Sequence, residues 1–425
     1  MFSKALRQYG ENLNDLRNFV ESVSGFLAQE IDKQAKADAR KLFPLTLALS
    51  KMDSQKFPAE KIKEISRILG DDVSVTDCTK TGTKGSVKLV FKNPTQAREF
   101  QKALDSFRGQ LEQGNHLHRT TLISLICCVE WFLSSLLHTY YEKYPDAAAS
   151  KEKQLSLNDL RSLGTVDDAV KHLIEIKVED VLRKNFNDWL SYLKENLKLT
   201  LKYIEKDRES LDECFQRRNI LVHNAGIVNT IYLSKVPVNL RDNIKTGDII
   251  PVNKEYVETA IRLFEKSFIL IGAELWKKVD EKDSNRGKCL VNLGYTHLTH
   301  SRWDIAENIF GFMKADKQMD ESTRLTAAIN YWQCLKWQNR FSECKKEVED
   351  TDFSAKEDRY SLARMALLDQ ENEYFKLLPR VLKSNGISEE DLFDWPLFQG
   401  IRKTKTFKKR YGSSYATWQK KQGLS

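Results

Sequence analysis

Residues 117–141 read LHRTTLISLICCVEWFLSSLLHTYY, and this stretch decides the fold class. Apolar residues occupy most faces of a helix built from it, which is typical of a helix at the centre of a fold. A membrane span needs at least ~18 uncharged apolar residues. Residues 122–137 are fewer and include Glu130. We therefore predict a central helix in a mostly α protein that does not cross a membrane.

Further helical patterns follow on the C-terminal side, as far as residue 280. Thr165 is a candidate N-cap for a helix, and apolar residues recur at helical spacing up to residue 197. The next helix ends in QRRNILVHNAG, where Gly226 is a natural stop. Residues 231–252 are expected to be extended before a last long helix. Together these patterns predict a helical domain over residues 113–280.

The N-terminal side has a different pattern. Its first helix carries apolar residues spaced alternately three and four apart. This spacing is typical of a helix that docks on its own domain or of one that pairs in a two-chain coiled coil. Two strands are predicted at residues 73–77 and 86–91, and Asn93 with Pro94 begins another helix. Residues 1–112 are therefore expected to form a small α+β unit.

Beyond residue 281 the chain contains self-similar helix pairs. Gly294 precedes Trp303 and Phe310, and the pattern returns around Trp332 and Phe341. A small residue facing bulky ones resembles tetratricopeptide repeats, but the step from Trp303 to Phe341 is 38 residues rather than the ~34 of that repeat. A generic array of helical hairpins is the alternative. Residues 281–425 are expected to be repeats that bind a protein partner or trigger, ending in a basic tail.

The net charge of the 425-residue chain is +8, and all of it lies in that tail. Residues 395–425 contain eight basic residues and no acidic one, and aromatic residues alternate with them. This mixture is expected where a phosphate backbone is neutralised and bases stack, although a solvated end of the repeats is the alternative. The residues predicted to bind RNA here are Arg402, Lys403, Lys405, Lys408, Lys409 and Arg410.

Seven cysteines without a CxxC pair favour free thiols in a reducing compartment over disulfides or zinc. The N-terminal residues lack the apolar core of a signal peptide, so a cytoplasmic location is expected. The sequence contains no phosphate-binding glycine loop and no HExxH or GxSxG motif. We therefore expect no metal and no cofactor.

The residues that carry chemistry are Arg218 and His223, at the end of an otherwise apolar helix. Cleavage of RNA without a metal needs one group to move the proton of the 2′-OH and another to stabilise the dianionic phosphorane. Histidine suits the first task, and the permanently charged guanidinium suits the second. The alternative is structural, because cations near a helix C-terminus also complement its dipole.

Glu130 is the only charged residue in the apolar part of the central helix. Burying a carboxylate without a partner is costly, so an arginine such as Arg218 or Arg217 is expected beside it. The alternative is that Glu130 reaches solvent at the edge of the helix.

The segment RNILVH, from Arg218 to His223, resembles the signature of the HEPN ribonuclease superfamily, in which four to six residues separate an arginine from a histidine and a polar residue often follows the arginine. The HNAGIVN continuation and the helices upstream add to this resemblance, which covers residues 115–280. It implies that Arg218 and His223 are catalytic, that Asn219 orients them and that Glu130 faces them. It also implies a homodimer in which two motifs share one cleft. Some HEPN toxins carry a modified tyrosine two positions after the histidine, but here that position is Ala225.

Two hypotheses follow for the function. The first is a metal-independent endoribonuclease with RNA as substrate, in which Arg217 also contacts RNA. The resemblance suggests a toxin or antiphage role for it, with tRNA as a conceivable target. The second is a non-catalytic dimeric scaffold that presents its helical repeats to a protein partner.

Overall fold

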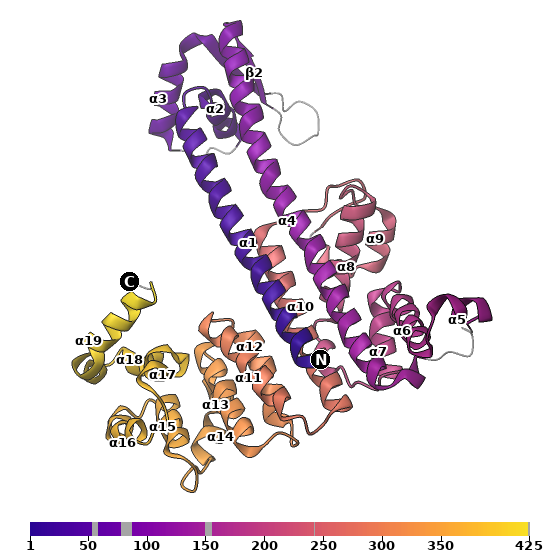
Figure 1. Ribbon diagram of the computed structural model, residues 1–425. Helices are drawn as coiled ribbons and strands as arrows, with labels where there is room; N and C mark the ends of the chain where they lie inside the picture. The colour runs from indigo at the N-terminus through magenta and orange to yellow at the C-terminus, as the bar shows by residue number, and fades with distance from the viewer. Residues whose placement is uncertain (53–57, 78–86, 149–154, 242, 424–425) are drawn as a thin grey trace. The chain divides into compact units, whose positions relative to one another are not determined.

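The computed structural model describes residues 1–52, 58–77, 87–148, 155–241 and 243–423 of the chain. These residues are mostly α-helical, and within them the sheet structure is limited to one pair of strands, which confirms the predicted fold class (Figure 1). The contacts divide the chain into two compact units. The larger unit comprises Met1–Asn14, Leu125–Ile250 and Glu258–Ser425, and the smaller comprises Asp15–Ser124 and Pro251–Val257.

The smaller unit contains the predicted α+β elements. Helices α2 (Phe43–Met52) and α3 (Ala59–Leu69) pack on the antiparallel strands β1 (Val73–Asp77) and β2 (Val87–Phe91). Val73 pairs with Phe91 in this register, and the small core consists of Leu47, Ile65, Leu69 and Val73. Both strands are confirmed where they are described; residue 86, the predicted start of the second, lies outside the described residues.

Helix α4 (Pro94–Lys143) corrects the prediction that one helix ends near residue 112 and another begins near 117. It is a single helix of 50 residues, so the expected domain boundary at 112/113 falls inside it. The intervening residues are polar, and their one glycine, Gly114, has open space where a side chain would be. A lone glycine costs a helix only about 1 kcal/mol relative to alanine, which does not end a helix of this length.

The C-terminal part of α4 is the centre of the larger unit, as predicted. Leu125, Ile126, Phe132 and Leu136 are fully buried there. The Phe132 ring stacks on Tyr9 of α1 (Phe2–Ala37), with ring centroids 4.2 Å apart. The same unit contains α5 (Leu157–Leu163), α6 (Val166–Leu182), α7 (Phe186–Glu195), α8 (Arg208–His223) and most of α10 (Lys254–Val279).

The prediction of an extended segment over residues 231–252 is wrong in its first part. Helix α9 (Thr230–Lys235) begins there, because the Asn229 side chain accepts a hydrogen bond from the backbone N–H of Tyr232 and caps it. The short 3-10 helix η5 (Val238–Leu240) follows. Among the described residues of this segment, extended pairing is limited to one antiparallel bridge between Ile227 and Ile249.

Successive helices form the C-terminal part of the larger unit: α11 (Ser284–Thr299), α12 (Trp303–Ala315), α13 (Glu321–Trp337), α14 (Lys345–Asp350), α15 (Asp358–Leu367) and α16 (Glu371–Lys383). Gly294 of α11 lies directly against the Phe310 ring of α12. A Cβ atom at Gly294 would lie 2.5 Å from Cζ of that ring. The expected packing of a small residue on a bulky one is therefore present, while the tetratricopeptide likeness stays a prediction.

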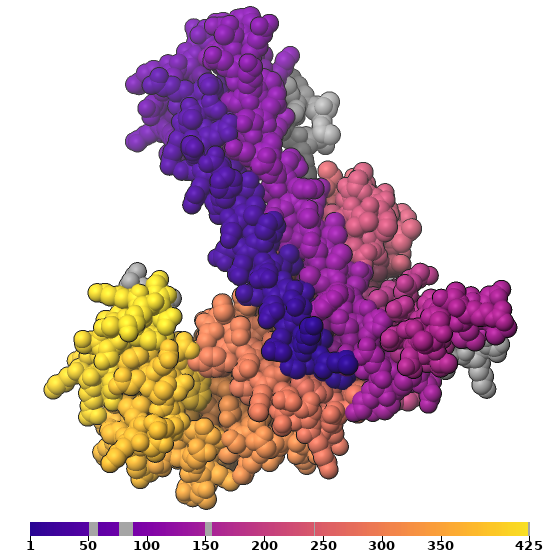
Figure 2. Space-filling view, in the orientation of Figure 1, coloured from indigo at the N-terminus to yellow at the C-terminus, as the bar shows by residue number. Residues whose placement is uncertain are grey.

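The chain ends in α17 (Glu389–Asp394), the 3-10 helix η7 (Pro396–Phe398), α18 (Gln399–Arg402) and α19 (Lys405–Lys421). Phe407 of α19 is buried, and Tyr415 and Trp418 stack on each other and pack on Phe393 of α17. In the space-filling view α11–α19 form one continuous body (Figure 2). Phe407 therefore belongs to the core of this body, and Tyr411, Tyr415 and Trp418 pack against it and are partly buried.

Candidate active site

Helix α8 ends at His223 and leaves this imidazole exposed. The backbone N–H groups of Asn224 and Gly226 both donate to the carbonyl oxygen of Ile220, at 2.9 and 3.1 Å. Ala225 and Gly226 have left-handed backbone angles, with φ of +52° and +79°. This reversal of the chain stops the helix directly after His223, so the histidine stands at the negative end of the helix dipole.

Arg218 of α8 forms an ion pair with Glu130 of α4. The distance from Nη2 of Arg218 to Oε1 of Glu130 is 2.5 Å, and the two side chains remain 21% and 34% exposed. The expected pairing of Glu130 with an arginine is therefore present, although the residues are 88 positions apart in sequence. Within the described residues, the Nε of Arg218 is buried without a hydrogen-bond partner. The carboxylate thus fixes one edge of the guanidinium, and the rest of the group keeps unused donors.

Arg217, one position earlier, is buried in a different environment. Its Nε donates to Oε1 of Glu213 at 2.7 Å, and the two side chains are 2% and 5% exposed. The hydroxyl of Tyr232 on α9 donates to the same carboxylate oxygen, also at 2.7 Å. Burial, and then the Glu213 carboxylate, raise the pKa of Tyr232 well above its usual value. The prediction that Arg217 contacts RNA is wrong, because this side chain is in the interior.

Glu213 and Tyr232 were not singled out from the sequence. A signal for Glu213 was present, since it precedes Arg217 by four positions and residues at this spacing meet on a helix. Tyr232 gave no such signal, because its contact with Glu213 depends on how α9 folds back on α8.

His223 and Asn219 do not join the Arg218–Glu130 pair. In the described part of the chain no hydrogen bond or ion pair connects either of them to Arg218. The helical period explains this for His223, because five positions along an α-helix turn the side chain by about 140° away from the first. One chain therefore holds the arginine and the histidine on different sides of the same helix end.

Exposed apolar side chains surround this helix end. Val222 precedes His223, Ile227 and Ile249 face each other across the β-bridge, and Ile231 lies in α9. All four are among the large apolar side chains that the fold leaves exposed. We call these four residues the apolar rim.

The predicted RNA-binding residues of the tail divide into two groups. Arg402 is a correction, because its Nη1 donates to the carbonyl oxygens of Leu392 and Trp395 at 3.0 and 2.9 Å and so ties α18 to α17. Arg410 lies over the Phe375 ring and donates to the Phe375 carbonyl oxygen. The remaining predicted residues are exposed on α18–α19: Lys403, Lys405, Lys408 and Lys409.

Two other features bear on the type of site. Among the described residues, no group of three or more His, Cys, Asp or Glu side chains is placed to hold a metal ion. Helix α4 is the one described helix long and apolar enough to cross a membrane, but half of its apolar window is buried in the fold. A core helix meets the same criteria of length and composition, so α4 is weak support for a membrane location.

No protein-family model, curated protein or solved structure matches the chain significantly. The function proposed below therefore rests on the side chains themselves and on the motif resemblance.

Proposed function

We propose that the protein is a metal-independent endoribonuclease whose active site is built from the C-terminal turns of α8. The observation that carries the proposal is the Arg218–Glu130 ion pair. It fixes a partly exposed guanidinium on the same helix end as the exposed His223, and the Cα atoms of the two residues are about 7.5 Å apart along the helix axis. A fixed cation and a titratable imidazole on one accessible helix end are the two groups that this reaction needs.

In this mechanism His223 takes the proton of the ribose 2′-OH as the 2′ oxygen attacks phosphorus. A bond forms from phosphorus to the 2′ oxygen, and the bond from phosphorus to the 5′ oxygen breaks as the protonated His223 returns its proton to the leaving 5′ oxygen. Arg218 neutralises the phosphorane, Glu130 holds Arg218 in place, and Asn219 orients the substrate. The products carry 2′,3′-cyclic phosphate and 5′-OH ends.

The separation of Arg218 and His223 around α8 favours a homodimer as the active form. In a dimer, the arginine of one copy and the histidine of the other converge on one phosphate. The apolar rim supports this arrangement, because a second copy that covers its four exposed side chains removes their apolar surface from water. Burying apolar surface stabilises an interface by roughly 25 cal/mol per Å². The RNA strand then extends toward other surfaces, among which the four exposed lysines of α18–α19 add phosphate contacts.

The biological role follows from the resemblance alone. A toxin or antiphage effector in the cytoplasm, acting on RNA such as tRNA, fits a nuclease that waits for a trigger. The helical hairpins α11–α16 are the surface proposed for that trigger or for another protein partner.

The test is incubation of the full chain with total RNA in EDTA, comparing wild type with His223→Ala. Replacing a general acid–base group typically costs about 10²- to 10⁴-fold in rate, and the product ends are identified by their susceptibility to phosphatase and kinase. His172→Ala is the matched control, because His172 is a partly exposed helical histidine of the same unit. Cleavage that survives His223→Ala, or that requires added metal, would contradict the proposal.

A dimeric scaffold without activity is the second candidate. The observation that favours it is that Arg218 is already engaged by Glu130 while His223 is bonded to neither of them within the described residues. A dimer that stays inactive toward RNA in every form, but binds a protein through α11–α16, would identify this candidate.

A further inference from the structure

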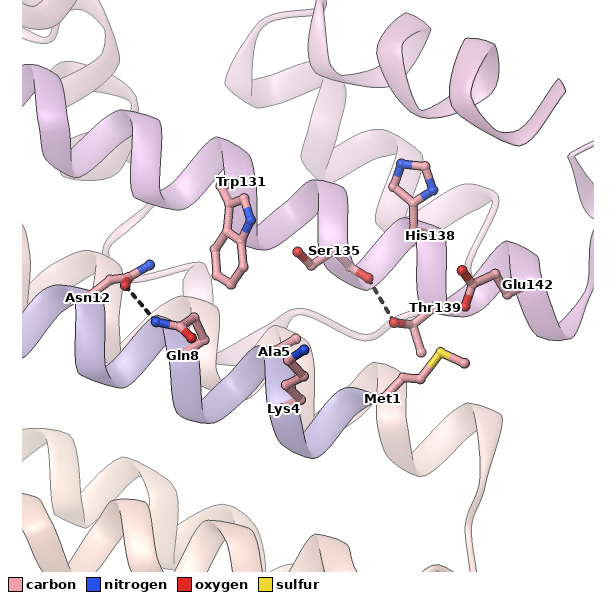
Figure 3. Close-up of a pocket in the computed structure, with 10 residues that line it drawn as sticks. All are labelled: Met1, Lys4, Ala5, Gln8, Asn12, Trp131, Ser135, His138, Thr139 and Glu142. Atoms are coloured by element: carbon pink, nitrogen blue, oxygen red, sulfur yellow. Dashed lines mark hydrogen bonds between the residues drawn. The ribbon is translucent and has the colours of Figure 1, made fainter. Parts of the chain in front are cut away.

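A groove of about 750 Å³ lies in the larger unit between the first turns of α1 and the last turns of α4. This volume is within the roughly 300–1,000 Å³ of small-molecule sites. Lys4, Gln8 and Asn12 follow one another along α1 at intervals of four, so they lie on one helix face. Trp131, Ser135, Thr139 and Glu142 of α4 line the opposite wall (Figure 3).

Trp131 is the unusual member of this groove. All eight tryptophans lie within the described residues, and Trp131 alone is classed as exposed, at 41%. Its ring extends from α4 toward Gln8 and Asn12 of α1 (Figure 3). An exposed aromatic ring does not gain the free energy that burial would give it. At the wall of a groove, such a ring offers a face on which a flat ligand, such as a nucleobase, can stack.

The amides opposite the ring offer a matched donor and acceptor. Nε2 of Gln8 donates to Oδ1 of Asn12 at 3.0 Å, which fixes the orientation of both side chains. The bond leaves the Gln8 carbonyl oxygen as an acceptor and the Asn12 amide N–H groups as donors. Amide side chains in this arrangement suit the edge of a nucleobase, which also presents a donor beside an acceptor.

The charges of the groove limit the ligand further. Lys4 is an exposed cation without an ion-pair partner among the described residues, and it can neutralise a phosphate. Glu142 is a carboxylate on the opposite wall and disfavours additional negative charge. The third ionisable side chain that lines the groove is His138, which carries no negative charge in either protonation state. One permanent cation against one carboxylate suits a ligand with a single phosphate better than a triphosphate.

We propose that this groove is a nucleotide-binding site that holds a base on Trp131 and one phosphate near Lys4. The nucleotide comes either from a single-stranded RNA, in which case the inference rests on the proposed function, or from a free mononucleotide that regulates the protein. The base edge is read by Gln8 and Asn12, and Ser135 and Thr139 line the side available to the ribose. Trp131 follows Glu130 directly in α4 but lies about 100° further around the helix, so the groove against α1 and the Arg218–Glu130 pair lie on different faces of α4.

The test measures binding to the full chain in the His223→Ala background, which prevents cleavage from interfering. The probes are AMP, ATP and a short fluorescent single-stranded RNA. Trp131→Ala should weaken binding by about 5- to 150-fold, the range of one base stacked on an aromatic ring. Trp131→Phe keeps a ring and should recover most of this loss. Phe19→Ala is the matched control, because it removes an exposed aromatic of α1 outside the groove.

Each outcome decides between supporting and overturning the site. If the ligand is a free mononucleotide, Trp131→Ala should lose AMP binding, and the protein with Trp131 intact should bind AMP at least as tightly as ATP. Loss confined to the RNA probe supports an RNA strand. Unchanged affinity for every probe in Trp131→Ala and Lys4→Ala overturns the inference, as does an equal loss in Phe19→Ala. If Trp131→Ala does not fold, Lys4→Ala and Gln8→Ala test the same contacts.

The two proposals fail separately. RNA cleavage that survives His223→Ala or requires added metal, together with nucleotide binding that depends on Trp131, ends the proposed function and leaves the groove. RNA cleavage that depends on His223, without any effect of Trp131 or Lys4 on binding, ends the inference about the groove and leaves the function.

Discussion

Arg217 and Arg218 are neighbours on α8, yet they lie in opposite environments. Arg217 is enclosed with Glu213 and Tyr232, whereas Arg218 reaches across to Glu130 and stays partly exposed. A step of about 100° around the helix separates the two. The difference teaches that two adjacent arginines can have separate roles: Arg217 stabilises the interior of the fold, while Arg218 stays accessible to solvent. The predictions below test this division of roles.

Arg217→Ala should have the largest effect, a loss of about 3–5 kcal/mol in the free energy of unfolding, because it leaves the buried Glu213 carboxylate without its cation. Urea denaturation followed by circular dichroism measures it. The double variant Arg217→Met with Glu213→Leu is the control, and it should recover much of the loss because no unpaired charge is buried. A single variant as stable as the wild type would show that the pair is not closed in solution.

Arg218→Ala should instead reduce RNA cleavage by about 10²- to 10³-fold, the usual cost of removing one donor that stabilises a transition state. Its free energy of unfolding should change by only ~0–1 kcal/mol, as is typical of exposed ion pairs. The two measurements are made on the same preparation. Arg183→Ala provides the control, since Arg183 forms an exposed pair with Glu179 in the same unit. A large loss of stability with activity intact would reverse the roles assigned to the two arginines.

Tyr232→Phe should cost about 1–2 kcal/mol at neutral pH, because Glu213 loses a buried hydrogen bond. The pKa of Tyr232 is raised in the folded state, so its contribution is complete below the unfolded pKa of about 10 and is lost as pH rises toward the folded pKa. The gap between wild type and variant should therefore narrow above pH 10. Denaturation curves at neutral and alkaline pH measure this, and a gap that widens would disprove the role of the hydroxyl.

Asn229→Ala should have the smallest effect, about 1 kcal/mol, through loss of the cap of α9. The same substitution should loosen α9 and so increase amide hydrogen exchange around Tyr232, without changing the Arg218–Glu130 pair. Asn229→Asp, which keeps a capping oxygen, serves as the comparison. Equal exchange in all three proteins would mean that the cap does not hold α9.

Much of the fold could be predicted because it depends on local patterns. The apolar faces of residues 117–141 indicated the central helix, and the two strands followed from their alternation and turn residues. The helix α9 was missed because its β-branched and aromatic residues favour strands, while the deciding group is the side chain of Asn229. The partner of Glu130 was predicted from the cost of an unpaired carboxylate.

The tail shows how the same pattern supports two interpretations. Phe407, Tyr411, Tyr415 and Trp418 are spaced four, four and three residues apart, which is the spacing of one helix face. The prediction that these residues stack on bases rested on their composition, a mixture of aromatic and basic residues. In the structure their spacing places them on one face of α19, and this face packs on the core. Which of two adjacent arginines is buried could not be predicted either, because Tyr232 reaches Glu213 from an element that local pattern does not position.

The contact of Gly294 with Phe310 has a consequence for how this chain can vary. Because the ring occupies the space of a Cβ atom, no other residue fits at position 294 while Phe310 keeps its place. A smaller side chain at 310 removes that obstacle but leaves a void beside glycine. Either single replacement is therefore expected to destabilise the packing of α11 on α12. The two positions are thus energetically coupled, so the effect of a substitution at one depends on which residue occupies the other.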